Sequence, residues 1–208
     1  MAAAVAVLVV PATEEAFVAL TTLHPYVAGF AKFAYLATMG ELLAVRILAG
    51  DWALPKALAA RAAIWGFLGM AVTLFFPVFA SGVQAAMARG LLPGGEDRLL
   101  GALFTATLMN ATFGPVLMGF HRFTDTWLDL AAEGRERPSV EAVARRIDWA
   151  GFCSFVILKT LPGFWIPAHT VVFLLPPEFR VVAAAFLSVA LGGILAFARR
   201  RKPAPVAA

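Results

Sequence analysis

The chain has 208 residues, of which 61% are hydrophobic and 14% charged. A soluble globular protein is about half apolar and about a quarter charged, so a water-soluble fold of this size would have too few charges to cover its surface. The excess apolar side chains must face lipid, and the composition predicts an integral membrane protein. The net charge is +4, but the basic residues cluster at the ends of apolar runs, which is typical of membrane topology. No nucleic-acid partner is therefore expected.

Five apolar segments are candidate membrane spans. They lie near residues 25–47, 62–88, 99–120, 149–177 and 181–198. Each is long enough to cross the hydrocarbon core, which takes roughly 17–25 apolar residues. The predicted fold is all-α, a polytopic transmembrane helix bundle that forms a single integral membrane domain over residues 1–208. The first segment contains Lys32 and Glu41, so four spans are expected if this segment lies in the interface.

The polar segment between the third and fourth spans predicts a short amphipathic helix near residues 139–149. Ser139 is a good N-cap residue, and Val140, Val143 and Ile147 fall on one helical face. An apolar face opposite charged side chains is typical of a helix that lies in the headgroup region. The alternative is a solvated connector.

The basic residues predict the orientation of the spans. Eleven of them fall on the side of the C-terminus if there are five spans: Arg46, Lys56, Arg61, Arg135, Arg137, Arg145, Arg146, Arg199, Arg200, Arg201 and Lys202. Only Arg89, Arg98 and Arg180 fall on the opposite side. Because an excess of Lys and Arg marks cytoplasmic loops, we expect a cytoplasmic C-terminus.

The third segment carries its polar residues on one helical face. Asn110, Gly114, Leu117, His121 and Asp125 follow one another at spacings of four, three, four and four. Three interpretations remain open: a polar lining of a water-filled pathway, a packing stripe with a satisfied histidine, and a metal pair completed by His169. His121 and Asp125 supply too few ligands for a zinc site by themselves, so no metal and no cofactor are expected.

Three prolines predict breaks in the spans. Pro115 follows Gly114 in the third segment, and Pro162 and Pro167 lie five residues apart in the fourth. A proline inside a helix removes one hydrogen bond and clashes with the preceding turn. Transporters build binding sites from such interrupted helices, so these positions mark a candidate polar centre.

Polar residues at membrane depth are costly and need partners. Glu41 and Lys32 are nine residues apart, half a rotation on a helix, so each needs a partner from elsewhere. Lys159 lies about two turns into the fourth span and requires Glu41 or Asp125, unless its stem reaches the interface. Cys153, the single cysteine, cannot form an internal disulfide, and its apolar surroundings predict a small buried side chain.

The C-terminal third resembles the family of the twenty-two-kilodalton peroxisomal membrane protein and the Mpv-seventeen mitochondrial inner-membrane protein. The matching positions are Trp165, Pro167, His169, Phe173, Pro177 and Arg180, followed by the last span. The family has Gln where His169 stands and Asn where Val172 stands. Upstream, Gly40-Glu41 is similar to a Gly-Asp pair at the end of the family's first helix. The resemblance implies a small helical membrane protein that forms a channel or carries small metabolites, here in a bacterial version.

The preferred hypothesis is a channel- or transporter-like protein of a bacterial cytoplasmic membrane that passes ions or small metabolites. Its partners are the lipid bilayer and these solutes, and oligomerisation is compatible with the sequence. Its polar centre would comprise Glu41, Asn110, His121, Asp125, Lys159 and His169. One alternative is a membrane-embedded enzyme that acts on a lipid or quinone with His121 and Asp125 as an acid–base pair. Another is a non-catalytic scaffold subunit. No nucleophile motif, phosphate loop or dinucleotide fingerprint supports a catalytic role.

Overall fold

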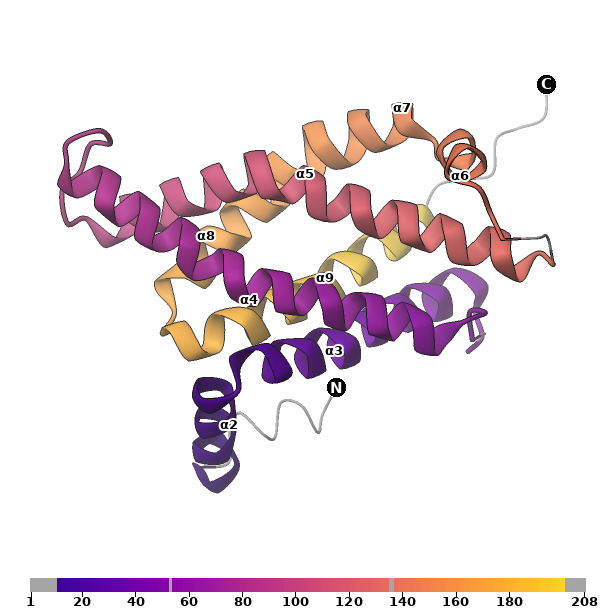
Figure 1. Cartoon of the computed structure of the whole chain (residues 1–208), viewed down its shortest axis with the longest axis horizontal. Coiled ribbons are helices and arrows are strands. Elements are labelled where there is room, and N and C mark those ends of the chain that lie inside the picture. The colour runs from indigo at the N-terminus through magenta and orange to yellow at the C-terminus, as the bar shows by residue number, and fades with distance from the viewer. Residues whose placement is uncertain (1–10, 53, 135–136, 201–208) are drawn as a thin grey trace. The chain divides into compact units, whose positions relative to one another are not determined.

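The computed structural model describes residues 11–52, 54–134 and 137–200, and every regular element in this part of the chain is a helix (Figure 1). The helices are α2 (Pro11–Leu23), α3 (Pro25–Ala49), α4 (Leu58–Ala88), α5 (Arg98–Ala132), α6 (Val140–Arg146), α7 (Trp149–Gly151), the π-helix η1 (Phe152–Trp165), α8 (Ile166–Leu174) and α9 (Pro177–Arg200). The all-α prediction is confirmed.

Five helical stretches are long and apolar enough to cross a membrane. They are Pro25–Ala49, Leu58–Ala88, Arg98–Ala132, Trp149–Leu174 and Pro177–Ile194. The chain is therefore an integral membrane protein. The third stretch is longer than the predicted span 99–120, because a charge can end an apolar run without ending a helix. Its 35 residues extend over roughly 52 Å at 1.5 Å per residue, well beyond a hydrocarbon core of about 30 Å.

Large apolar side chains on these helices stay uncovered within the chain. Val116 on α5, Leu158 on η1 and Val171 on α8 are 67%, 71% and 62% exposed. In water such a surface would promote association. In a bilayer it is the surface that lipid covers, as the composition predicted.

The chain folds into two compact units. Unit 1 comprises residues 1–69 and 182–208, and unit 2 comprises residues 70–181. The boundaries fall inside α4 and α9, so each of these helices contributes to both units. The single-domain interpretation stays a prediction.

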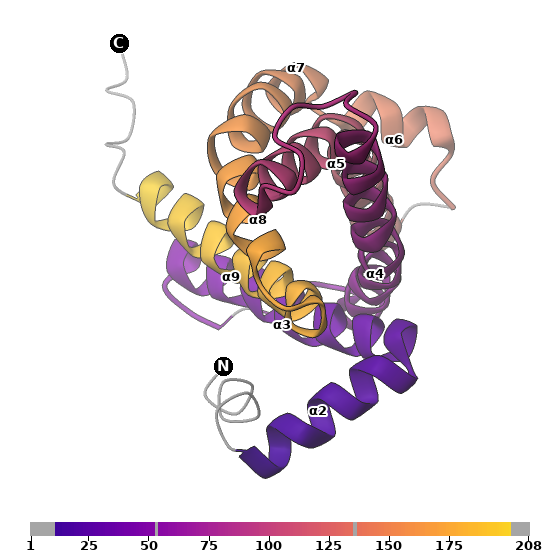
Figure 2. The same cartoon turned by 90° about the vertical axis from the view of Figure 1, so that its left-hand side faces the viewer.

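In unit 1, α2 and α3 meet at a bend at His24 (Figures 1 and 2). The Lys32 ammonium on α3 donates to Thr21 Oγ1 on α2 at 2.7 Å and lies 4.3 Å from the centre of the Phe17 ring. The partners of the Lys32 ammonium thus lie on α2, outside the predicted spans.

Glycines bring the helices of unit 1 into close contact. A Cβ atom added at Gly40 would lie 3.0 Å from the Val189 Cα on α9, and one added at Gly69 on α4 would lie 2.6 Å from the Phe33 Cβ on α3. Small residues allow helix backbones to approach in membranes, where packing rather than the hydrophobic effect drives association.

In unit 2, α4 and α5 form an antiparallel hairpin (Figure 1). Gly90, Gly94 and Gly95 in the connecting loop have φ values of 71°, 102° and 55°, a conformation that favours glycine. The Phe75 ring of α4 stacks on the Phe113 ring of α5 with centroids 4.2 Å apart. η1 and α8 continue the chain and pack along α5.

The predicted breaks at the three prolines are not present. α5 continues through Pro115, and Pro162 lies inside η1. η1 accommodates its proline with the wider π-helical spacing, in which Thr160 Oγ1 donates to the Phe155 carbonyl five residues back, at 3.0 Å. Pro167 lies in the first turn of α8, which follows η1 directly.

The predicted helix near residues 139–149 corresponds to α6. Its N-cap Ser139 accepts the Ala142 N–H at 3.1 Å. Val143 and Ile147 are buried against Leu130 at the end of α5, whereas Val140 is exposed. The helix is confirmed, and its place in the headgroup region stays a prediction.

Two glycine substitutions on α4 test the close packing in unit 1. Gly69→Ala should lower the midpoint of thermal unfolding in detergent, because the new methyl group overpacks the contact with Phe33, at a typical cost of about 1–3 kcal/mol. Gly82→Ala is the matched control, since nothing lies within 4 Å of a Cβ added there. It should leave the midpoint equal or raise it, because Ala favours a helix by about 1 kcal/mol over Gly. Equal effects of the two variants would contradict the close contact.

Candidate functional site

A buried polar pair joins α5 and α8 inside unit 2. Asn110 and His169 are only 3% and 8% exposed. Asn110 Nδ2 lies 3.0 Å from His169 Nδ1 and donates to the Ala106 carbonyl at 2.8 Å. When the imidazole nitrogen accepts, both N–H groups of the amide are used. An asparagine in the middle of a span requires such an interhelical hydrogen bond.

Two aromatic rings contact the His169 imidazole of this pair. Trp165 stacks on the His169 imidazole with centroids 5.1 Å apart, and Phe76 of α4 meets the same imidazole edge-on at 5.7 Å. Trp165 Nε1 is buried and has no hydrogen-bond partner among the described residues. The pair therefore lies in an apolar shell that leaves one buried donor unused.

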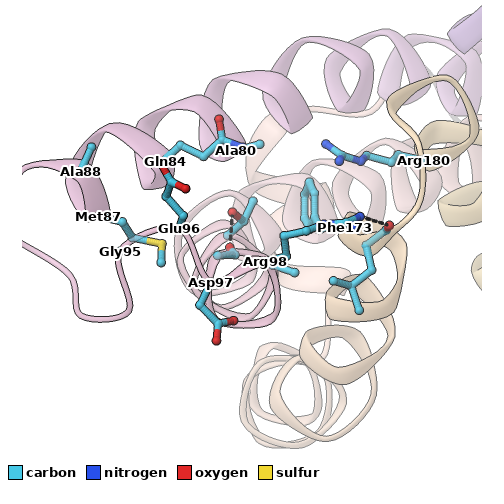
Figure 3. A pocket seen from close by; sticks show the side chains of 14 residues that line it. Ala80, Gln84, Met87, Ala88, Gly95, Glu96, Asp97, Arg98, Phe173 and Arg180 are labelled. Carbon is cyan, nitrogen blue, oxygen red and sulfur yellow. Dashed lines mark hydrogen bonds between the residues drawn. The ribbon is translucent and has the colours of Figure 1, made fainter.

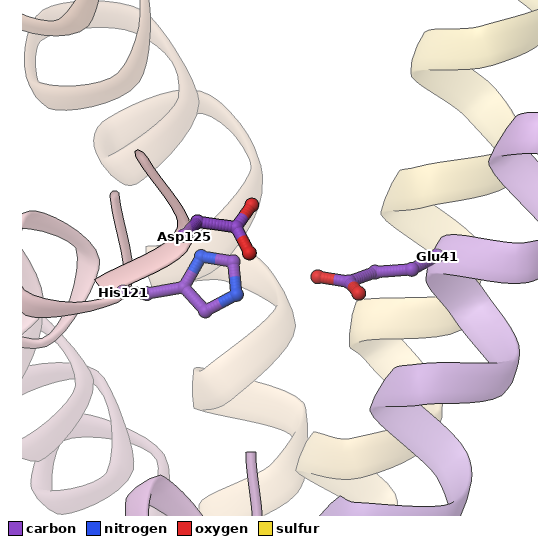
Figure 4. A group of neighbouring side chains, drawn as sticks. All are labelled: Glu41, His121 and Asp125. Atoms are coloured by element: carbon purple, nitrogen blue, oxygen red, sulfur yellow. The ribbon is translucent and has the colours of Figure 1, made fainter. Parts of the chain in front are cut away.

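The predicted stripe on α5 divides into two parts. Its first part is a packing seam, in which Asn110 binds His169 and a Cβ added at Gly114 would lie 3.2 Å from a Leu161 methyl group of η1. His121 and Asp125 follow one turn apart (Figure 4). Asn110, the partner of His169, lies 11 residues before His121, about 16 Å along a helix. His169 therefore does not complete a metal pair with His121 and Asp125.

Glu41 belongs to unit 1, and Figure 4 draws it on α3. Its Oε1 accepts the indole N–H of Trp65 on α4 at 2.9 Å. The sequence indicated that Glu41 needs a partner from another helix, but it did not identify Trp65. Nearby on α3, Gly40 contacts the backbone of α9.

One prediction for the fourth span is wrong, because Cys153 is exposed rather than buried. Lys159 is exposed within the chain as well, and its place in a polar centre stays a prediction. The physical reason is the π-helix, whose wider turn places side chains on different faces from those of an α-helix. Thr160, next to Lys159, is the polar side chain that η1 buries.

A pocket of about 650 Å³ opens in unit 2 beside the α4–α5 loop (Figure 3). Its polar lining includes Arg98 at the start of α5, Arg180 in the first turns of α9, Gln84 on α4 and Glu96 in the loop. Apolar side chains such as Met87 and Phe173 complete the wall. A largely apolar cavity of this size with a few polar groups is typical of a small-molecule site.

Two rings connect the pocket with the buried pair. Phe173 lines the pocket, and Phe76 packs on it with centroids 5.0 Å apart. Phe76 also contacts His169. We call Phe76 and Phe173 the aromatic floor, since ring contacts run from Phe173 at the pocket through Phe76 to His169.

The predicted residues and the pocket overlap only in part. Phe173 and Arg180 line it, and Pro177 begins α9 between them. Sequence reasoning assigned Arg98 and Arg180 to topology alone. Both begin spans on the same predicted side of the membrane, and this shared side is the signal that could have placed them together.

No family model, no curated protein and no solved structure matches the chain. The assignment of this site therefore depends on its own geometry.

A double-mutant cycle tests the buried pair. Asn110→Leu and His169→Phe should each lower the free energy of unfolding by about 1–2 kcal/mol, because each leaves a buried polar atom without its partner. The double variant should lose less than the sum of the two, as expected for residues in direct contact. Chemical unfolding in mixed micelles measures both quantities. Thr112→Val, which removes only a bond from an exposed hydroxyl to its own helix, is the control, and additive losses in the cycle would contradict the pairing.

Proposed function

We propose that the chain is a channel- or transporter-like membrane protein that passes small solutes or ions through unit 2. The observation that carries this proposal is the pocket of about 650 Å³ among the ends of candidate spans, with a buried polar pair beyond its aromatic floor. Polar residues inside a membrane-spanning unit are costly, and they commonly mark solute pathways.

The side chains of the pocket and of the region beyond its floor support solute passage. The pocket combines charged and amide side chains with an apolar wall. Beyond the floor, the indole N–H of Trp165 is a further hydrogen-bond donor without a partner among the described residues.

The proposed setting is a bacterial cytoplasmic membrane with the C-terminus inside. In that topology Arg98 and Arg180 belong to the side with few basic residues, so the pocket would open to the outside. The acid–base pair of the enzyme alternative does not line this pocket, because His121 and Asp125 lie far along α5 from Arg98.

A scaffold subunit is the second candidate, and one observation favours it. The Asn110 amide is satisfied inside the protein by Ala106 and His169, as expected when a polar pair only fastens two helices. The two candidates differ in whether the aromatic floor limits the passage of solutes.

Solute flux through proteoliposomes tests the proposal. Wild type should release small polar solutes, and Phe173→Ala should release them several-fold faster, because truncation of the buried ring opens the floor. Phe155→Ala is the matched control, since Phe155 is exposed on η1. It should behave as wild type. Absence of flux in wild type and in a folded Phe173→Ala variant would reject the transport function and favour the scaffold.

A further inference from the structure

Two arginine side chains converge on the pocket of unit 2 from different helices. Arg98 Nη2 donates to the Leu174 carbonyl at 3.5 Å, and Arg180 Nε donates to the Leu175 carbonyl at 2.9 Å. Both acceptors lie at the end of α8. These carbonyls hold the two guanidinium groups beside one cavity and leave most of their N–H groups unused.

Neither arginine forms an ion pair with another described residue. Arg180 is half-buried, with its guanidinium 5.7 Å from the centre of the Phe173 ring. Arg98 lines the same cavity as Arg180. Guanidinium groups brought together in this way are stabilised by a bound anion that accepts hydrogen bonds from both.

The neighbouring carboxylates do not replace such an anion. Asp97 accepts the Leu100 N–H as the N-cap of α5, and Figure 3 shows its side chain directed away from Arg180. Glu96 lies on the Gln84 side of the pocket in the same view. Glu178, two residues before Arg180, forms no ion pair with it.

We propose that Arg98 and Arg180 form a binding site for a small organic anion with a carboxylate or phosphate group. Both groups match the planar donor pattern of arginine. The cavity is larger than such a group alone, and the apolar wall of Met87 and Phe173 suits an apolar body attached to it. The inference names the substrate class for the proposed transport function and rests on that function for its role in passage.

Anion titrations of the full chain in a neutral detergent test the site. Calorimetry would measure the Kd of inorganic phosphate and of succinate at constant ionic strength, with chloride as the balancing ion. Arg98→Gln and Arg180→Gln should each raise the Kd at least tenfold, because each removes a charge-assisted hydrogen-bond donor. Arg98 is exposed, so its variant should fold even if the Arg180 variant does not.

Arg89→Gln is the matched control. It removes the same charge just after α4, and Arg89 does not line the pocket. Its Kd should stay within twofold of wild type. The assignment of the site would be overturned if wild type bound neither of the two anions nor an anionic lipid. Equal losses of anion affinity in all three variants would also overturn it.

A second arm separates a free solute from a lipid headgroup. In nanodiscs of phosphatidylcholine the free anions should bind as in detergent. A lipid phosphate occupies the site if phosphatidylglycerol abolishes the binding of the free anions in wild type and itself binds more weakly to the Arg98→Gln and Arg180→Gln variants. Binding of lipid that is unchanged in both variants would overturn the proposal.

The titrations and the flux assay fail independently. Anion binding without any solute flux in proteoliposomes would keep the site and reject the transport function. Solute flux without anion binding would keep the transport function and reject the anion site.

Discussion

The hydrogen bond between Asn110 and His169 is the constraint on which the arrangement of unit 2 depends. Both side chains are buried among apolar residues, where an unpaired polar group costs several kcal/mol. The bond therefore fixes α8 against α5 at one register. That register places Phe173, one turn beyond His169, against Phe76, and it brings the end of α8 to the mouth of the pocket.

The pocket follows from this register. The carbonyls of Leu174 and Leu175 lie where α8 ends, and they orient Arg98 and Arg180. The floor rings lie between these arginines and the buried pair. The position of the two arginines at the ends of the spans thus depends on the hydrogen bond between Asn110 and His169 at membrane depth.

Unit 1 is held together by a different physical device. Its helices approach at Gly40 and Gly69, and two of its charged residues, Glu41 and Lys32, form hydrogen bonds from one helix to another. Small residues and polar pairs are the two ways to hold helices together where lipid is as apolar as the helix faces.

The sequence by itself determined the class of the protein, its five apolar helices and the cap of α6, because these depend on local composition and spacing. It also placed Asn110, Gly114 and Leu117 on one face, and the structure uses this face as a seam. It could not determine that Pro115 and Pro162 leave their helices unbroken, or that Lys159 and Cys153 are exposed on η1. The π-helical turn of η1 decides this, and η1 packs against α5. Likewise, Arg98 and Arg180 are 82 residues apart, and only the tertiary fold brings their charges to one cavity.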